Sequence, residues 1–291
     1  MIPAFALARP DRLEAAFEVF ERAAGDAAWY AGGTELLQVM KMGLARFGTL
    51  VDLKRLPELR GISVGADGTL TIGAATTHRE IERSPVVREA LPALVRLEAH
   101  VANVRVRNQG TLGGNLCFAE PHSDPATLLL ACAARLHLAG ARGGRELGVD
   151  EFLLEPFVTA READEILVGV AIPPAAVGEG RAYEKAKFRE RPAVSVAVRL
   201  RVADGVITDA SVAVGSLTDI PVRVDEAANA LRGSAADPDG VEDALASAAA
   251  AMTGLDAIGD LDGSPDYKRH LAGVLVRRAT TAALSEALGR G

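Results

Sequence analysis

Two glycine-rich segments hold the residue types best suited to binding a phosphorylated ligand. The first, residues 31–35 (AGGTE), lies between a short apolar run and a helical pattern. Glycine lets a ligand approach the backbone closely, and successive N–H groups can form an anion-binding nest. A helix beginning near Thr34 would add its positive N-terminal end, which suits a pyrophosphate. For this segment alone a simple strand–turn–helix connection is the better explanation, because it matches neither the Gly-x-Gly-x-x-Gly motif nor a P-loop.

The second segment, residues 107–115 (RNQGTLGGN), places three glycines among hydroxyl and amide side chains that can bond phosphate and ribose. Its composition predicts a polar loop, and the density of such residues favours binding over a plain surface turn. Asp124 follows this segment, and its carboxylate could accept hydrogen bonds from ribose hydroxyls. Asp124 could instead cap the helix predicted to follow it, or do both.

The elements that must position these segments fall into two blocks. In the first block Asp67-Gly68 marks a hairpin, and two prolines break a long helical stretch. The composition of 173–180 is small and flexible, which predicts a domain boundary there. Beyond it, antiparallel strands joined at Asp204-Gly205 precede three helical patterns, an order typical of an α+β domain. The expected helices lie within 11–25, 34–43, 78–102, 127–134, 224–233, 239–252 and 265–289, and the expected strands within 49–56, 61–76, 135–140, 165–174, 181–202 and 205–216.

The overall composition limits the classes of protein to consider. The 291 residues allow two domains, and 49% hydrophobic with 24% charged residues is an ordinary globular balance. A net charge of -7 predicts no attraction to nucleic acid or to anionic membranes. No apolar run approaches the roughly 18 residues that span a bilayer, and the start of the sequence lacks a basic n-region. We therefore expect a cytoplasmic protein without membrane insertion.

The cysteines and histidines predict no metal site. Cys117 and Cys132 are the only cysteines, whereas an iron–sulfur cluster typically needs about four thiolates. Their spacing fits neither a zinc site nor a disulfide framework, and their apolar surroundings predict buried, inert thiols. Ser123 lacks the context of a nucleophile elbow, so hydrolase chemistry has no support. The dispersed histidines, which are expected to be surface or satisfied core residues, are His78, His100, His122, His137 and His270.

The two glycine segments, in this order and separation, resemble those of the flavoprotein (medium) subunits of the molybdenum hydroxylase family. That family includes carbon monoxide dehydrogenase and the FAD domain of xanthine dehydrogenase. The resemblance covers essentially the whole chain, but the extra cysteines of the benzoyl-CoA reductase branch, which bind a [4Fe–4S] cluster, are missing. The supporting segments are Phe5–Pro10, residues 164–167 followed by Ile172 and Pro173, residues 183–197 and residues 267–279.

The resemblance implies an α+β fold in two domains. Residues 1–176 would form an FAD-binding domain of the vanillyl-alcohol oxidase (PCMH) type, with subdomains of about 1–56 and 57–176. Residues 177–291 would form a small C-terminal domain of the carbon monoxide dehydrogenase flavoprotein type, with an antiparallel sheet and a helix bundle.

The resemblance also implies a function in electron transfer. In the family, substrate is hydroxylated at a molybdenum cofactor in a large subunit, and electrons pass through two [2Fe–2S] clusters of a small subunit to FAD. The terminal acceptor would be NAD, a quinone or oxygen, and no catalytic acid or base is required. One alternative is a stand-alone FAD-dependent oxidoreductase of the vanillyl-alcohol oxidase superfamily, although no residue is placed for covalent flavin attachment. A nucleotide-binding regulatory module is the other alternative.

Residue by residue, the resemblance implies FAD contacts in several parts of the chain. The pyrophosphate would be wrapped by the segment Trp29, Tyr30, Ala31, Gly32, Gly33, Thr34, Glu35 and Leu36. Val101 and Ala102 would lie near the flavin, and Leu167 would pack on the adenine or on the flavin ring. Lys185 would reach the flavin from the second domain, with Lys187 as its alternative. The ribityl–phosphate–ribose portion would be held by Thr111, Gly114, Asn115 and Asp124.

Overall fold

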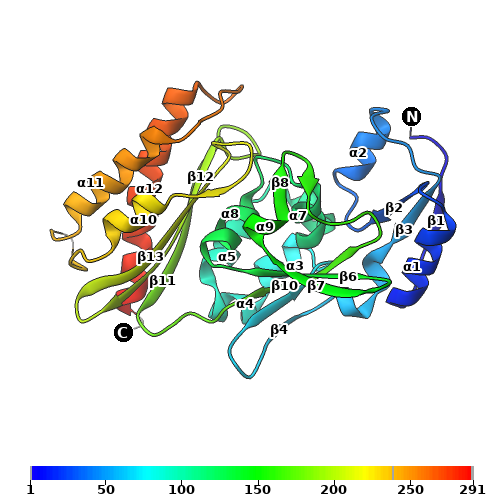
Figure 1. Cartoon of the computed structure of the whole chain (residues 1–291), viewed down its shortest axis with the longest axis horizontal. Helices are drawn as coiled ribbons and strands as arrows, with labels where there is room; N and C mark the ends of the chain where they lie inside the picture. The colour runs from blue at the N-terminus through cyan, green and yellow to red at the C-terminus, as the bar shows by residue number, and fades with distance from the viewer. Residues whose placement is uncertain (1, 238, 290–291) are drawn as a thin grey trace.

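The N-terminal part of the chain forms a small parallel sheet. The computed structural model describes residues 2–237 and 239–289, and its three larger sheets follow one another along its length (Figure 1). In the first, β1 (Ala6–Ala8) and β2 (Ala27–Tyr30) both pair in parallel with β3 (Thr49–Asp52). The helices α1 (Leu13–Arg22) and α2 (Leu36–Lys41) provide the crossovers that parallel strands require. Short 3₁₀ turns at Leu53–Arg55 and Pro57–Leu59 lead out of this sheet.

The middle part is built on a five-stranded antiparallel sheet in the order β4-β5-β10-β6-β7. The predicted hairpin is confirmed, because β4 and β5 pair across the Asp67-Gly68 turn, where Gly68 has a φ of +84°. The central strand, β10, pairs with β5 on one side and β6 on the other. The strands are β4 (Ile62–Val64), β5 (Leu70–Gly73), β6 (Arg135–Gly140), β7 (Gly143–Gly148) and β10 (Ile166–Ile172), with a separate pair β8 (Leu153–Glu155) and β9 (Val158–Thr159).

Short helices pack on this sheet, and prolines set several of their boundaries. Pro85 and Pro92 are the first residues of α4 and α5, where a missing N–H costs nothing. The segment predicted as a polar loop is instead mainly helical, because Asn103 and Thr111 cap two further helices with their side chains. The helices are α3 (His78–Arg83), α4 (Pro85–Ala90), α5 (Pro92–Glu98), α6 (Val104–Gln109), α7 (Leu112–Phe118), α8 (Asp124–Ala131) and α9 (Val149–Phe152).

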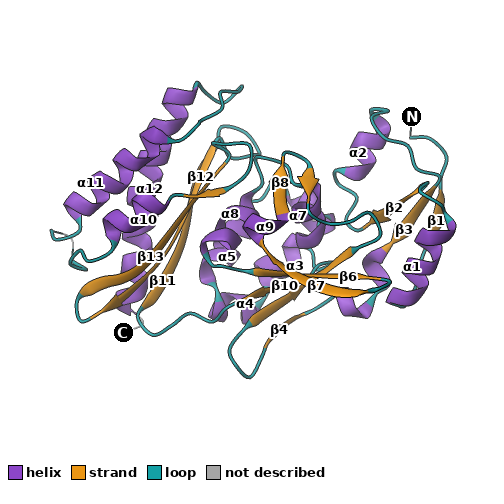
Figure 2. Cartoon of the chain, in the orientation of Figure 1, coloured by secondary structure: helices purple, strands orange, loops and turns teal. Residues whose placement is uncertain are grey.

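The C-terminal part is an antiparallel sheet covered by helices, as Figure 2 shows. Residues of β12 alternate: Val196 and Val198 face the C-terminal helices, whereas Ala197 joins the core formed with α8. Both faces of the sheet are therefore buried, and α8 ties it to the middle part through a Thr127–Ser195 hydrogen bond of 3.2 Å. The elements are β11 (Glu179–Ala186), β12 (Val194–Ala203), β13 (Val206–Gly215), β14 (Val222–Arg223), α10 (Asp225–Leu231), α11 (Glu242–Ala251), a 3₁₀ turn (Met252–Gly254) and α12 (Pro265–Gly289).

Candidate cofactor-binding site

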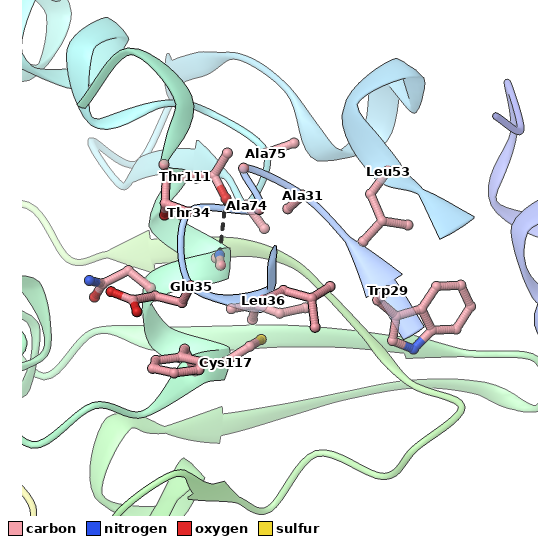
Figure 3. A pocket seen from close by; sticks show the side chains of 18 of the residues that line it. Trp29, Ala31, Thr34, Glu35, Leu36, Leu53, Ala74, Ala75, Thr111 and Cys117 are labelled. Carbon is pink, nitrogen blue, oxygen red and sulfur yellow. Dashed lines mark hydrogen bonds between the residues drawn. The ribbon is translucent and has the colours of Figure 1, made fainter. Parts of the chain in front are cut away.

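A cavity of about 580 Å³ lies where the first sheet, the middle part and a loop of the C-terminal part meet. Both glycine segments line it, although they are far apart in the sequence. Figure 3 shows Ala31, Ala74 and Thr111 gathered at one end, with Trp29 at the other. The cavity is therefore elongated between a backbone-rich end and an aromatic end.

The two glycine segments meet edge to edge at the backbone-rich end. A Cβ atom added to Gly32 would overlap the carbonyl oxygen of Gln109 and lie 2.7 Å from the Gly110 Cα. Gly33 has a φ of +73°, and a Cβ there would overlap the ring of Tyr30. Glycine is thus required at both positions by the fold. Backbone N–H groups exposed in such a segment can bind an anion such as a diphosphate.

The second segment is anchored to the middle sheet. Thr111 Oγ1 accepts a hydrogen bond from the backbone N–H of Gly114 (3.1 Å), which fixes the first turn of α7. The N–H of Gly113 donates to the Ala74 carbonyl at the end of β5 (2.8 Å). The helix predicted to begin near Thr34 is α2, which begins at Leu36 with Glu35 in the N-cap position, and it has only six residues. We therefore assign no helix-terminal charge to the first segment.

The aromatic end of the cavity is apolar and flat. Trp29 stacks on Phe20 with ring centroids 4.2 Å apart, and its Nε1–H donates to the Ala163 carbonyl (2.9 Å). Leu53 and Ile166, which belong to the same hydrophobic cluster as Trp29, also line the cavity. A planar ring system can be sandwiched by such side chains.

The predicted site residues are brought together with two exceptions, Tyr30 and Lys185. Lys54 Nζ lies 3.8 Å from the centroid of the Tyr30 ring. Lys185 donates a hydrogen bond to Asp124, which itself lines the cavity. Neither side chain lines the cavity. The residues that do line it are Trp29, Ala31, Gly32, Gly33, Thr34, Glu35, Leu36, Val101, Ala102, Thr111, Gly114, Asn115, Asp124 and Leu167.

Asp124 joins the cavity wall to the C-terminal sheet. It is the first residue of α8, whose N-cap is Ser123, so the capping alternative is wrong. Its Oδ1 accepts from Tyr183 Oη (2.5 Å) and from Lys185 Nζ (2.7 Å), both on β11. Burial raises the pKa of Asp124 and lowers that of Lys185, while their mutual attraction opposes both shifts. The pair is a buried ion pair across the two parts of the chain.

Arg191 is a cavity residue that the sequence did not single out. It extends from the β11–β12 loop and pairs with Glu35 (3.2 Å) and Glu120 (2.7 Å). Its neighbour Glu190 also lines the cavity and accepts a hydrogen bond from Asn103. The alternating charges of residues 189–191 (RER) between two strands are the only local signal. Their partners are too distant in the sequence to be inferred.

Comparison with known proteins gives the cavity its context. Residues 3–175 match the family described as "FAD binding domain in molybdopterin dehydrogenase", and residues 181–283 match "CO dehydrogenase flavoprotein C-terminal domain". The chain belongs to the molybdopterin dehydrogenase FAD-binding family. A relative, the carbon monoxide dehydrogenase medium chain of Hydrogenophaga pseudoflava, is 33% identical over 97% of both chains. The nicotine 6-hydroxylase medium subunit of Paenarthrobacter nicotinovorans is 32% identical, over 97% of this chain and 98% of the relative.

Solved structures of this family have the same fold. Carbon monoxide dehydrogenase from H. pseudoflava matches with a TM-score of 0.92 and 33% identity, covering 98% of this chain and 99% of that one. Quinoline 2-oxidoreductase from Pseudomonas putida 86 matches with a TM-score of 0.90 and 31% identity, covering 100% and 99%. The predicted family and its α+β fold, an FAD-binding domain followed by an antiparallel sheet with helices, are confirmed.

Burial disfavours the thiolate form of both cysteines of this family member. Cys117 lines the cavity and Cys132 lies in the core, and burial raises the pKa of each thiol to about 11. Within residues 2–237 and 239–289, no three histidine, cysteine or acidic side chains gather as metal ligands. In the same residues, no helix combines the length and apolar character that crossing a membrane demands.

A charged network beside the cavity rests on Asp260. Its Oδ2 accepts from Lys268 Nζ (2.7 Å), and it lies 2.9 Å from Nε2 of the cavity residue His122. Lys268 is 1% exposed, so its ammonium group is buried within this network. Partial burial alone would raise the pKa of Asp260, but the bonds from Lys268 and His122 lower it from 3.8 to about 2.

Replacing Asp260 with asparagine is expected to lower the free energy of unfolding near neutral pH. In acid the difference should shrink, because the wild type itself loses this contribution there. Because the folded-state pKa is depressed, the contribution is present above pH 3.8 and disappears as the pH falls toward 2. A shift of this size would correspond to about 2 kcal/mol in a buried pair, and solvent screening of this partly exposed carboxylate reduces the contribution to roughly 1 kcal/mol or less. Urea unfolding at neutral pH and at about pH 3 should show a larger difference between the two proteins at neutral pH. An equal difference at both values would contradict the assignment.

Proposed function

We propose that this chain is the FAD-binding electron-transfer subunit of a molybdenum hydroxylase complex. The observation that carries the proposal is the meeting of the two glycine segments at Gly32 and Gly110 on one cavity. Its relatives are medium chains of named dehydrogenases and hydroxylases, and they match over nearly their whole length. The protein is therefore an oxidoreductase component with FAD as its cofactor.

The chain's own residues bind and orient the cofactor. The glycine segments hold the diphosphate against bare backbone, and Trp29 and Leu167 pack on the ring systems. Asp124 accepts hydrogen bonds from ribityl or ribose hydroxyls with the oxygen that Tyr183 and Lys185 leave free. Bound FAD supplies the ability to accept electrons singly and release them in pairs. No catalytic acid or base is assigned to the protein.

The proposed partners follow from the family. A molybdenum cofactor-binding large subunit and a [2Fe–2S] small subunit would supply the electrons, and NAD, a quinone or oxygen would accept them. We also propose the domain boundary at 176/177, with 1–176 binding FAD. A cytoplasmic location stays a prediction.

Purified protein reconstituted with FAD is expected to bind it non-covalently, about one molecule per chain. Acid precipitation followed by chromatography of the supernatant should release FAD. Recovery of FMN, or of flavin that stays attached to the precipitate, would contradict the proposed cofactor site. Purification from the source cells should also bring down two other subunits with molybdenum and iron, and a lone flavoprotein would favour the stand-alone alternative.

A further inference from the structure

His78 is a buried histidine on the cavity wall, beside the junction of the glycine segments. It is the first residue of α3, and its side chain is 3% exposed. Its backbone N–H donates to the Gly110 carbonyl (3.1 Å), and a Cβ added to Gly110 would lie 3.1 Å from His78 Cδ2. The imidazole therefore lies beside Gly110, whose backbone is in contact with Gly32.

One ring nitrogen of His78 is occupied by Glu98. The two side chains meet with Nδ1 and Oε2 2.7 Å apart, and Glu98 is completely buried. Because a carboxylate only accepts hydrogen bonds, Nδ1 carries a proton in this pair. Nε2 is then an acceptor if the ring is neutral and a second donor if it is charged. Among residues 2–237 and 239–289, Nε2 has no hydrogen-bond partner.

Charged groups of four helices shift the pKa of the His78 ring. Burial alone lowers the pKa of His78, but Glu98 on α5 and Asp124 on α8 outweigh it and raise the pKa. Arg107 on α6 opposes this shift. The charge of Arg107 is partly compensated, because its Nε donates to Glu82 on α3 (3.1 Å). The cationic ring, with Nε2–H free to donate, is thus favoured.

Other cations on the cavity wall are already engaged. Both ring nitrogens of His122 lie within hydrogen-bond distance of carboxylates, Glu120 and Asp260. Arg191 is paired with two carboxylates, and Arg161 donates to backbone carbonyls. Of the two histidines that line the described cavity, His78 is the one that keeps a ring nitrogen for a ligand.

We propose that His78 binds the FAD diphosphate by donating from Nε2–H to an anionic oxygen at the Gly32–Gly110 junction. Glu98 is a positioning residue, because it fixes the protonated Nδ1 and stabilises the charge. The inference rests on the proposed function, since it takes FAD as the ligand. Deprotonation of His78 would turn a lone pair toward the anion, so FAD affinity must depend on pH.

The dissociation constant of FAD for the full-length apo-protein, measured by flavin fluorescence from about pH 6 to about pH 9, tests this. In the wild type, affinity is expected to fall as the pH rises through the folded-state pKa of His78. In His78→Gln, affinity at the low end should drop by roughly ten- to a hundredfold, as for the loss of a charge-assisted hydrogen bond. The pH dependence should disappear in this variant. Glu98→Gln, which retains His78, should instead move the fall in affinity to lower pH.

The ³¹P resonances of bound FAD give a readout that a merely structural histidine would not move. At saturating FAD, the diphosphate shifts of the wild type should titrate with the same midpoint, and those of His78→Gln should stay constant. His137→Gln, which alters a half-exposed histidine of β6 outside the cavity lining, is the matched control and should retain the titration. Loss of the titration in His122→Gln instead would overturn the proposal.

A further variant keeps the test valid if His78→Gln folds poorly. His78→Gln leaves the Glu98 carboxylate buried without a cation, whereas His78→Gln/Glu98→Gln leaves no buried charge. The double variant should also bind FAD weakly and independently of pH. Wild-type protein that binds FAD equally at all pH values would overturn this inference alone. Failure of the wild type to bind FAD at any pH would overturn the proposed function with it.

Discussion

Gly32→Val is expected to weaken FAD binding by about one to two orders of magnitude while most of the chain stays folded. The new Cβ would overlap the Gln109 carbonyl oxygen and lie 2.7 Å from the Gly110 Cα. Both are backbone atoms, so no side-chain rotation relieves the overlap, and the two glycine segments must separate. Overpacking of this kind costs about 1–3 kcal/mol, and a similar loss of binding energy corresponds to roughly five- to 150-fold in affinity.

Gly254→Ala is the matched control for this prediction. A Cβ at Gly254 would meet nothing within 4 Å, so neither folding nor FAD binding should change appreciably. Gly33→Val is a less clean test, because its φ of +73° disfavours any side chain whether or not FAD binds there. Fluorescence titration with FAD, beside circular dichroism of the apo-proteins, measures the effect. If Gly32→Val and the wild type bind FAD with equal affinity, the first segment only connects β2 to α2 and does not bind the cofactor.

The parts of the fold that the sequence predicted are those that depend on local chemistry. Asp67-Gly68 specifies a hairpin wherever it stands between alternating strands, and Pro85 and Pro92 start helices for reasons internal to each turn. The glycine segments were found in the same way, because glycine marks places where backbone must come close to something. The two glycine segments pack against each other, and this contact is visible only in the tertiary structure.

The prediction of a polar loop at residues 107–115 was wrong because it relied on composition and did not consider helix capping. The stretch around Gly110 reads as a loop because it is polar and rich in glycine, yet α6 and α7 occupy most of it. The side chains of Asn103 and Thr111 satisfy backbone N–H groups at the start of each helix, which offsets the poor helix propensity of glycine.

Charge pairs between distant segments could not be predicted at all. His122 and Asp260 are 138 residues apart in the chain, and Asp124 and Lys185 are 61 apart. Nothing near either residue in the sequence indicates its partner. A lysine is rarely fully buried unless it is paired, and the partner that allows Lys268 to be buried, Asp260, is recognised only in the folded chain.

Asp124→Ala is expected to lower the free energy of unfolding of the apo-protein by about 3–5 kcal/mol, the usual cost of removing one partner of a buried ion pair. The remaining ammonium group belongs to Lys185, whose side chain is only 8% exposed, and Tyr183 loses its acceptor as well. Asp124→Ala/Lys185→Met removes the unpaired charge, so it should recover much of the stability. Thermal melts of the apo-proteins measure this, and a double variant no more stable than Asp124→Ala would contradict the ion-pair account.

Asp124→Asn separates the structural role of this residue from its proposed role toward FAD. The amide oxygen still accepts from Tyr183 and Lys185, so the apo-protein should lose less stability than in Asp124→Ala. Toward a ribityl or ribose hydroxyl, however, the amide no longer offers a charge-assisted bond, typically worth about 1.5–3 kcal/mol. FAD affinity should therefore fall by roughly ten- to a hundredfold. If affinity stays at the wild-type level while Asp124→Ala still unfolds early, Asp124 holds the C-terminal sheet to the cavity and does not contact the cofactor.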